Sequence, residues 1–143
     1  MFLGEYQHSL DIKSRLIVPA KYREGLGDVF VVTKGLDNCL FLYPLDEWKA
    51  LEQKLKLLPM ASADARAVVR FFFSGACECE MDKQGRILLP QNLREYAHID
   101  KDVMVTGAGP RVEVWARDKW ETYLQQTEAS SGELAEKIAI LGI

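Results

Sequence analysis

The strongest constraint on the fold is a nine-residue pattern that occurs twice in the chain. Asp11-Ile-Lys-Ser-Arg-Leu-Ile-Val-Pro19 returns 71 residues later as Asp82-Lys-Gln-Gly-Arg-Ile-Leu-Leu-Pro90. In each copy an aspartate opens a short polar turn, an arginine closes it, three aliphatic residues follow, and a proline ends the run. A repeat of about half the chain length indicates that the two halves share one arrangement of secondary structure.

Each copy predicts a strand, a tight turn and a return strand. The carboxylate of an aspartate at the first turn position can accept a hydrogen bond from the backbone two residues on. Asp11 and Ser14 bound the first turn, and Asp82 and Gly85 bound the second, in which glycine suits the fourth position. The return strands then begin with an arginine at the tip of each hairpin, and their aliphatic residues are expected in the core.

The remainder of each copy predicts a short helix, two short buried strands and a second helix. Pro19 and Pro90 suit the first helical position, where a missing N–H costs nothing, and Gly25 and Gly27 are expected to end the first short helix. The expected short helices and strands lie at 20–24, 91–97, 29–33, 40–43, 103–106 and 112–115. The second helices open at Asp46 and Asp118.

These elements indicate an α+β protein with two tandem repeats, residues 1–58 and 74–127. A connecting helix is expected within 59–73, with Ser62 as N-cap. The tail, residues 128–143, is expected to hold a short helix that opens with a capping box from Ser130 to Glu133. Half of such a chain is marginal as an independent core. We therefore expect the repeats to interlock as one pseudo-symmetric, β-barrel-like unit with flanking helices, by strand swapping either within a chain or between chains.

Composition places the chain among cytosolic proteins. Of its 143 residues 48% are hydrophobic, enough for a core of ordinary size, but no apolar run is long enough for a membrane span. The first residues lack the basic and apolar regions of a secretory signal. Three cysteines without a framework spacing fit a reducing compartment.

The charge distribution is more informative than its sum. A net charge of −3 argues against a nucleic-acid partner. Residues 11–23, however, carry four basic side chains against one acidic side chain, whereas residues 118–143 carry two lysines against five acidic side chains. The repeated motif therefore attracts phosphate, and the C-terminal segment repels it.

No pattern in the sequence predicts an enzyme, a metal site or a cofactor. Cys77-Glu-Cys79 lacks the second pair of a zinc signature, and strand alternation predicts that both thiols lie on one buried face. His8 and His98 are too few to form a catalytic triad, and no glycine-rich phosphate loop follows a strand.

The paired turns, taken with the rest of the chain, resemble the MraZ family of bacterial regulators, which are built from two swapped-hairpin domains of the SpoVT/AbrB type. The resemblance rests on the turns and on several further segments: Met1-Phe-Leu-Gly4, Tyr22-Arg23, Leu42-Tyr-Pro-Leu45 with Trp48, and Cys79-Glu-Met-Asp82. The clearest departure is Ser14, where the family usually has glycine, although serine is tolerated in turns.

The resemblance implies a sequence-specific regulator, usually a repressor, of the gene cluster for division and cell-wall synthesis, including its own gene. It also implies a cytoplasmic, nucleoid-associated homo-oligomer, shaped as a ring, that binds short direct repeats in double-stranded DNA. An alternative is a non-catalytic RNA-binding or structural ring-forming protein. A ring would align many weakly basic motifs on successive repeats, so that avidity offsets the net charge.

By this resemblance the functional turns fall on Asp11, Lys13 and Arg15 and on Asp82, Lys83 and Arg86. We expect Lys13, Arg15, Lys83 and Arg86 to bind DNA, because a guanidinium suits both phosphate and guanine. We assign the aspartates to turn formation. The competing interpretation is that each arginine only pairs with its own aspartate, and the basic residues of the short helices, Lys21, Arg23 and Arg94, stay open between a solvated face and DNA.

Overall fold

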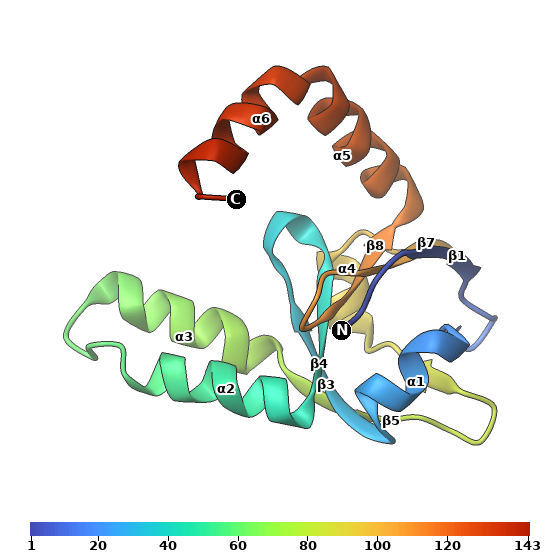
Figure 1. Ribbon diagram of the computed structural model, residues 1–143. Coiled ribbons are helices and arrows are strands. Elements are labelled where there is room, and N and C mark those ends of the chain that lie inside the picture. The colour runs from blue at the N-terminus through green and yellow to red at the C-terminus, as the bar shows by residue number, and fades with distance from the viewer.

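Both repeats fold with the same order of elements. The computed structural model describes the backbone of residues 1–143 and every side chain except that of Ser131. The first repeat contains β1 (Glu5–Ser9), β2 (Arg15–Ile17), α1 (Ala20–Leu26), β3 (Val29–Lys34), the 3₁₀ turn η1 (Leu36–Asn38), β4 (Leu40–Pro44) and α2 (Leu45–Lys56). The second contains β5 (Cys77–Glu80), β6 (Arg86–Leu88), α4 (Gln91–Tyr96), β7 (Asp102–Gly107), β8 (Val112–Ala116) and α5 (Arg117–Ala129). Two further helices, α3 (Ala63–Gly75) and α6 (Ser131–Ile140), follow α2 and α5, so the α+β class is confirmed (Figure 1).

The repeats exchange their first strands within one chain. The six-stranded antiparallel sheet has the order β1-β7-β8-β4-β3-β5, so β1 of the first repeat pairs with β7 of the second, and β5 of the second pairs with β3 of the first. The return strands β2 and β6 pair with each other in a separate two-stranded ribbon. This order reads the same when the repeats are interchanged, which is the signature of a pseudo-twofold axis between β4 and β8.

Two predictions about the strands need correction. The strands of each predicted hairpin, such as β1 and β2, find their ladder partners in the other repeat instead of in each other. The barrel-like form is not confirmed either, because no closed sheet is found among the described residues and β1 and β5 remain as edges. The β2–β6 ribbon has only three residue pairs, so it covers part of one sheet face and joins neither edge.

The sheet separates two hydrophobic clusters because side chains of a strand alternate between its faces. One face packs against the ribbon, α1 and α4, and buries Leu16, Val18, Ile87, Leu89 and Leu93 together with Phe30, Val32, Leu40, Leu42, Val103 and Val105. The other face packs against α2, α3 and α5, and buries Val31, Phe41, Tyr43, Trp48, Met104 and Trp115. The ribbon and the long helices therefore lie on opposite faces of the sheet.

The helix termini follow the sequence signals with three differences. Pro19 and Pro90 are the residues just before α1 and α4 and not their first helical positions. Gly27, with φ +81°, ends α1, and Gly25 lies inside the helix. Ser62 caps α3 by accepting from the N–H of Ala65, as predicted. Ser130 makes no such bond before α6, because its φ and ψ of −104° and 29° are not those of an extended N-cap.

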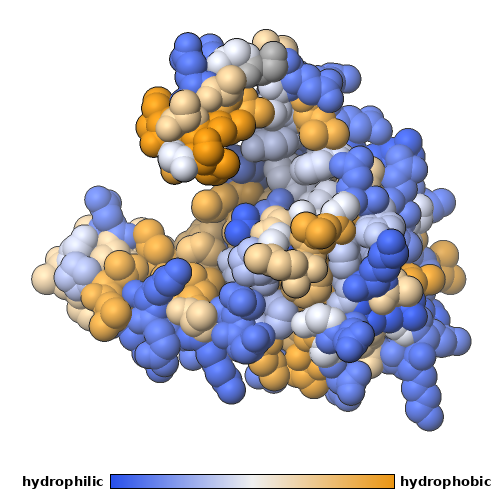
Figure 2. Space-filling model, viewed as in Figure 1, coloured by the Kyte–Doolittle hydropathy of each residue, from blue (hydrophilic) through white to orange (hydrophobic). Residues whose placement is uncertain are grey.

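Two helical arms project from the sheet. The antiparallel helices α2 and α3 form one arm, and α5 with α6 forms a bent second arm that carries the C-terminus (Figure 1). The space-filling view shows a hollow between the arms, with apolar side chains gathered on α6 (Figure 2). Among the described residues, none of the helices combines the length and apolar character needed to cross a membrane.

Candidate nucleic-acid interface

The β2–β6 ribbon presents two arginines and two aliphatic side chains to solvent. In the antiparallel register Arg15 lies opposite Leu88 and Ile17 lies opposite Arg86, with the Leu16–Ile87 pair between them. Leu16 and Ile87 are buried against the sheet, so alternation turns the other four side chains outward. The residue pair that contains Arg15 and the pair that contains Arg86 are two residues apart, about 7 Å along the ribbon. We call Arg15, Ile17, Arg86 and Leu88 the ribbon face.

Each arginine of the ribbon face is held by the aspartate of its own turn. One oxygen of Asp11, Oδ1, accepts from the N–H groups of Lys13 and Arg15, both at 2.9 Å, and Oδ2 accepts from Nε of Arg15 at 2.7 Å. The turn is closed by the N–H of Ser14, which donates to the carbonyl of Asp11.

The second turn repeats this geometry. Oδ1 of Asp82 accepts from the N–H groups of Gln84 and Arg86, both at 2.9 Å, and Oδ2 accepts from Nε of Arg86 at 2.8 Å. The N–H of Gly85 donates to the carbonyl of Asp82. Two turns of different sequence thus fix their arginines in the same way.

These hydrogen bonds favour the ionised form of both aspartates. The backbone N–H of Arg15, followed by its guanidinium, holds the pKa of Asp11 below its usual value, and Arg86 does the same for Asp82. A carboxyl whose pKa is lowered on folding stabilises the turn above its usual pKa, and this contribution is lost as pH falls through the lowered value. This contribution of both aspartates is therefore present at neutral pH.

The ion pairs leave the outer part of each guanidinium free. Only Nε of Arg15 and of Arg86 bonds to the aspartate, and no partner for their terminal Nη groups is found among the described residues. A guanidinium carries five N–H donors in a planar fork, so the Nη groups can still donate to phosphate or to a base edge. Pairing with aspartate and binding of DNA are compatible.

The two predicted lysines do not occupy equivalent positions. Lys13 is the third residue of its turn and Lys83 is the second, so the counterparts are Ile12 with Lys83 and Lys13 with Gln84. Both lysines are exposed. Each turn carries one lysine, but at a different place on its tip.

The arginines of the short helices have a structural role. Nε of Arg23 donates to the carbonyl of Val18, and Nε of Arg94 donates to the carbonyl of Leu89, each at 3.0 Å. Both bonds fasten a short helix to the end of the strand before it.

Each turn is also held by the other repeat. The carbonyl of Gly85 accepts from the N–H of Val18 at 2.8 Å, and the carbonyl of Ser14 accepts from the N–H of Leu89 at 3.2 Å. Gly85 has φ +76°, and a Cβ there would overlap the guanidinium of Arg23. Ser14 has φ +61°, so serine adopts the left-handed conformation for which glycine is the usual residue.

Sequence reasoning missed the exposure of Ile17 and Leu88, which it placed in the core with the other aliphatics. Ile17 is 46% exposed and Leu88 is 61% exposed. Strand alternation could have predicted this exposure, because it places Ile17 on the same face as Arg15 and Leu88 on the same face as Arg86. The prediction failed because a run of three aliphatic residues is typical of a strand that is buried on both faces.

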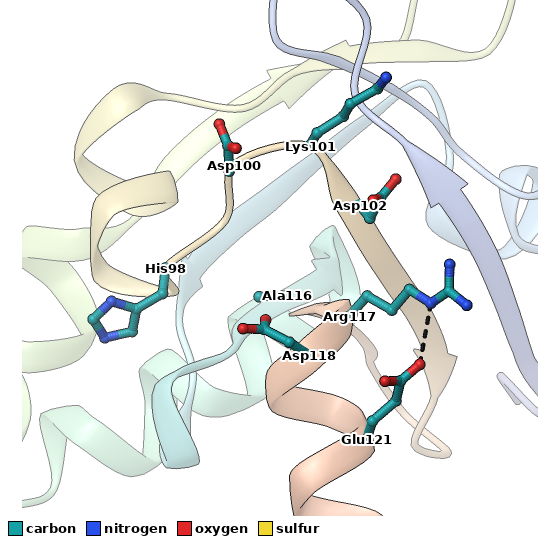
Figure 3. Close-up of a pocket in the computed structure, with 8 residues that line it drawn as sticks. All are labelled: His98, Asp100, Lys101, Asp102, Ala116, Arg117, Asp118 and Glu121. Carbon is teal, nitrogen blue, oxygen red and sulfur yellow. Dashed lines mark hydrogen bonds and ion pairs between the residues drawn. The ribbon is translucent and has the colours of Figure 1, made fainter.

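The opening drawn in Figure 3 is polar and lies between the start of β7 and the start of α5. Its side chains diverge: Nε of Arg117 donates to Glu121 at 3.1 Å, whereas His98 and Lys101 point away from this pair. Asp102 accepts from the hydroxyl of Ser9 at 2.9 Å. These acidic groups repel phosphate, so this opening and the ribbon face differ in the ligands they favour.

The cysteines differ from the prediction that both are buried. Cys79 is buried in the core, and burial raises the pKa of its thiol to about 12, whereas Cys77 is exposed at the first residue of the edge strand β5. The described residues contain no group of three or more histidine, cysteine, aspartate or glutamate side chains placed to hold a metal ion.

Comparisons with known proteins agree with the repeat. The family model described as "MraZ protein, putative antitoxin-like" matches residues 1–71 and again residues 72–140. The chain is 65% identical over 141 residues to the protein named "Transcriptional regulator MraZ" from Desulforamulus reducens, covering 99% of both chains. It is 63% identical over 143 residues to the protein of that name from Pelotomaculum thermopropionicum, covering 100% of this chain and 99% of the relative. A third relative of that name, from Acetivibrio thermocellus, is 61% identical over the full length of both chains. The chain, with its two matched repeats and their exchanged strands, therefore belongs to the MraZ family.

Proposed function

We propose that this protein is a transcriptional regulator that binds duplex DNA sequence-specifically through the ribbon face. The observation that carries the proposal is the pair of arginines that a two-stranded ribbon holds outward, each oriented by its own turn. The major groove of B-DNA admits a two-stranded β-ribbon, and several DNA-binding proteins read bases with such a ribbon. The relatives named as transcriptional regulators support the same assignment.

The proposed roles divide by residue type. Arg15 and Arg86 donate their free Nη groups to guanine or phosphate, and Lys13 and Lys83 neutralise phosphates beside the ribbon. Asp11 and Asp82, with Ser14 and Gly85, shape the turns and orient the arginines. No cofactor or catalytic group takes part in this function.

We further propose a ring of identical subunits assembled through the helical arms. The arms expose aliphatic side chains, including Val68 on α3 and Leu134 and Ile138 on α6, and a hollow lies between the two arms (Figure 2). In the first repeat, α3 packs against the hydrophobic cluster that contains Trp48. Phe73 of α3 lies 5.8 Å from Trp48 of α2, measured between ring centroids. In the second repeat, α6 follows α5 after a single residue and lies away from the sheet (Figure 1).

The two arms differ, because α3 packs against its own repeat whereas α6 lies away from the sheet. This difference favours a head-to-tail contact between subunits. The α2–α3 arm of one subunit is proposed to fill the hollow beside α5 and α6 of the next subunit. A contact between two different surfaces generates a ring when the rotation between subunits closes. Arg66 and Arg70 on α3 would face an arm rich in glutamate, so charge complements shape. The ribbon face lies on the other side of the sheet and stays open.

The biological role in this proposal is repression of the division and cell-wall gene cluster, including the protein's own gene, in the cytoplasm at the nucleoid. Ring assembly aligns several ribbon faces on successive direct repeats, so modest single contacts combine into strong binding. The division into repeats of residues 1–58 and 74–127, with a connecting helix at 59–73 and a tail at 128–143, stays part of this proposal.

Footprinting on the DNA upstream of the protein's own gene tests the function. We expect protected direct repeats at a constant spacing, and binding that random duplex DNA or RNA of equal length competes for poorly. Protection without sequence preference, or stronger competition by RNA than by the upstream duplex, would contradict the proposal in favour of a non-specific or RNA-binding protein.

A further inference from the structure

The ribbon face contains two aliphatic side chains that neither the core nor the arginine contacts explain. Ile17 and Leu88 are 46% and 61% exposed, and each lies directly opposite an arginine, Ile17 opposite Arg86 and Leu88 opposite Arg15. Directly opposed residues of an antiparallel pair have Cβ atoms about 5 Å apart. A ligand that reaches one of these arginines therefore meets the neighbouring aliphatic side chain as well.

The chemistry of the major groove offers one apolar group to such a side chain. Thymine presents its 5-methyl group there, next to hydrogen-bonding edges such as O6 and N7 of guanine, which suit arginine. Successive base pairs are about 3.4 Å apart, so an arginine and an aliphatic side chain about 5 Å apart can contact neighbouring base pairs. We propose that Ile17 and Leu88 are specificity-determining residues that contact the 5-methyl groups of thymines beside the bases bound by Arg86 and Arg15.

This inference rests on the proposed binding of duplex DNA and adds a base preference to it. Ile17 and Leu88 are related by the pseudo-twofold axis that interchanges β2 and β6. A ribbon seated with this axis over the centre of its site places the two side chains over opposite DNA strands. The two contacts therefore concern two different thymines, one for each side chain.

Replacement of thymine by deoxyuridine tests the contact because it removes only the methyl group. Duplexes are first selected from a random pool by the wild-type protein. Each thymine of the selected duplex is then replaced singly by deoxyuridine, and the dissociation constant is measured for the wild type, Ile17→Ala, Leu88→Ala and the control Leu36→Ala. Leu36, which is 59% exposed, lies in η1, outside the ribbon and its turns.

For the wild type and the control, we expect deoxyuridine at two positions on opposite strands to weaken binding about fourfold, the effect of one buried methyl group. Ile17→Ala should lose the penalty at one position only, and Leu88→Ala at the other. The ratio of the two dissociation constants is measured on one protein sample, so partial unfolding of a variant cancels from it.

The failure of this inference can be told from failure of the proposed function. A wild type that selects no duplex overturns both. A wild type that selects a sequence but is indifferent to deoxyuridine, or whose alanine variants keep both penalties, overturns the thymine contact and leaves sequence-specific binding intact.

Discussion

Asp11 and Asp82 stand beside the side chains that we propose to contact DNA, although an anion there repels phosphate. Their oxygens accept two backbone N–H groups and one guanidinium Nε in each turn. If orientation of the arginine outweighs repulsion, these acidic residues strengthen DNA binding. Charge repulsion alone predicts instead that these acidic residues weaken DNA binding.

The variant Asp11→Ala separates these effects. We expect it to weaken binding to the upstream duplex several-fold, because the turn and Arg15 lose their common acceptor, and Asp11→Asn to weaken it less. Fluorescence anisotropy at physiological salt measures the affinity. Asp118→Ala, which removes an acidic side chain outside the ribbon, is the control, and a rise in affinity for both alanine variants would contradict the positioning role.

The residues that end the two turns predict opposite changes in stability. Gly85→Ala should lower the free energy of unfolding by about 1–2 kcal/mol, since an L-residue at positive φ is strained and its Cβ meets Arg23. Ser14→Gly relieves the same strain in the other turn, so it should raise the free energy of unfolding or leave it unchanged. Denaturant unfolding measures both, and Gly132→Ala, whose Cβ would meet nothing within 4 Å, is the control. A Gly85→Ala variant as stable as that control would show that the turn tolerates a side chain.

At the scale of secondary structure, exchange of strands makes each repeat depend on the other. β1 pairs with β7, and β2 pairs with β6, so in each case the ladder partner belongs to the other repeat. Burial of Leu16 against the sheet, worth about 1.5–3 kcal/mol, likewise requires strands from both repeats. We therefore expect the core to unfold as one cooperative unit.

A fragment of residues 1–58 is therefore expected to remain unfolded as a monomer or to associate. It keeps β1 to β4 but lacks β5, β6, β7 and β8. Circular dichroism with sedimentation equilibrium tests this. A monomeric fragment that unfolds cooperatively would contradict the dependence of one repeat on the other.

The positions of most helices and strands could be predicted from the sequence, and particular residues show why. The Asp11 and Asp82 turns are local, so their chemistry alone locates β2 and β6. The partners of β1 and β5 are not local, because either repeat offers an equally suitable strand, and hydrophobic pattern cannot choose between them. The exposure of Ile17 and Leu88 was missed for a related reason, since it depends on β2 and β6 forming a ribbon of their own.

At the scale of the whole molecule, the sheet places the proposed DNA contacts and the proposed subunit contacts on opposite sides. The ribbon face covers one side, and the α2–α3 and α5–α6 arms lie on the other. A net charge of −3 is then compatible with the proposed DNA binding, because the acidic arm lies on the side of the sheet opposite the ribbon face. Sequence alone located the charges but not the sheet that separates them.

Disruption of the arms should dissociate the proposed ring without unfolding the subunit. Val68→Glu on α3 and Ile138→Glu on α6 each place a charge on an exposed aliphatic position, where an intersubunit contact tolerates it poorly. We expect smaller species in analytical ultracentrifugation and much weaker binding to an array of repeats, with little change for a single repeat. Leu36→Glu is the control for a charge on an exposed position elsewhere, and assemblies of unchanged size in both test variants would rule out the proposed contact.

The central claim is that the ribbon face binds DNA through its two arginines. The most direct measurement is the affinity of Arg15→Ala, Arg86→Ala and the control Arg117→Ala for the upstream duplex and for random duplex DNA at physiological salt. Arg117 is an exposed arginine on α5 that also pairs with a carboxylate four residues away, so all three variants lose one positive charge and one ion pair. We predict that Arg15→Ala and Arg86→Ala each lose roughly tenfold or more in affinity for the upstream duplex, with unchanged assembly, and that Arg117→Ala binds like the wild type. Equal affinities for all three variants would contradict the account.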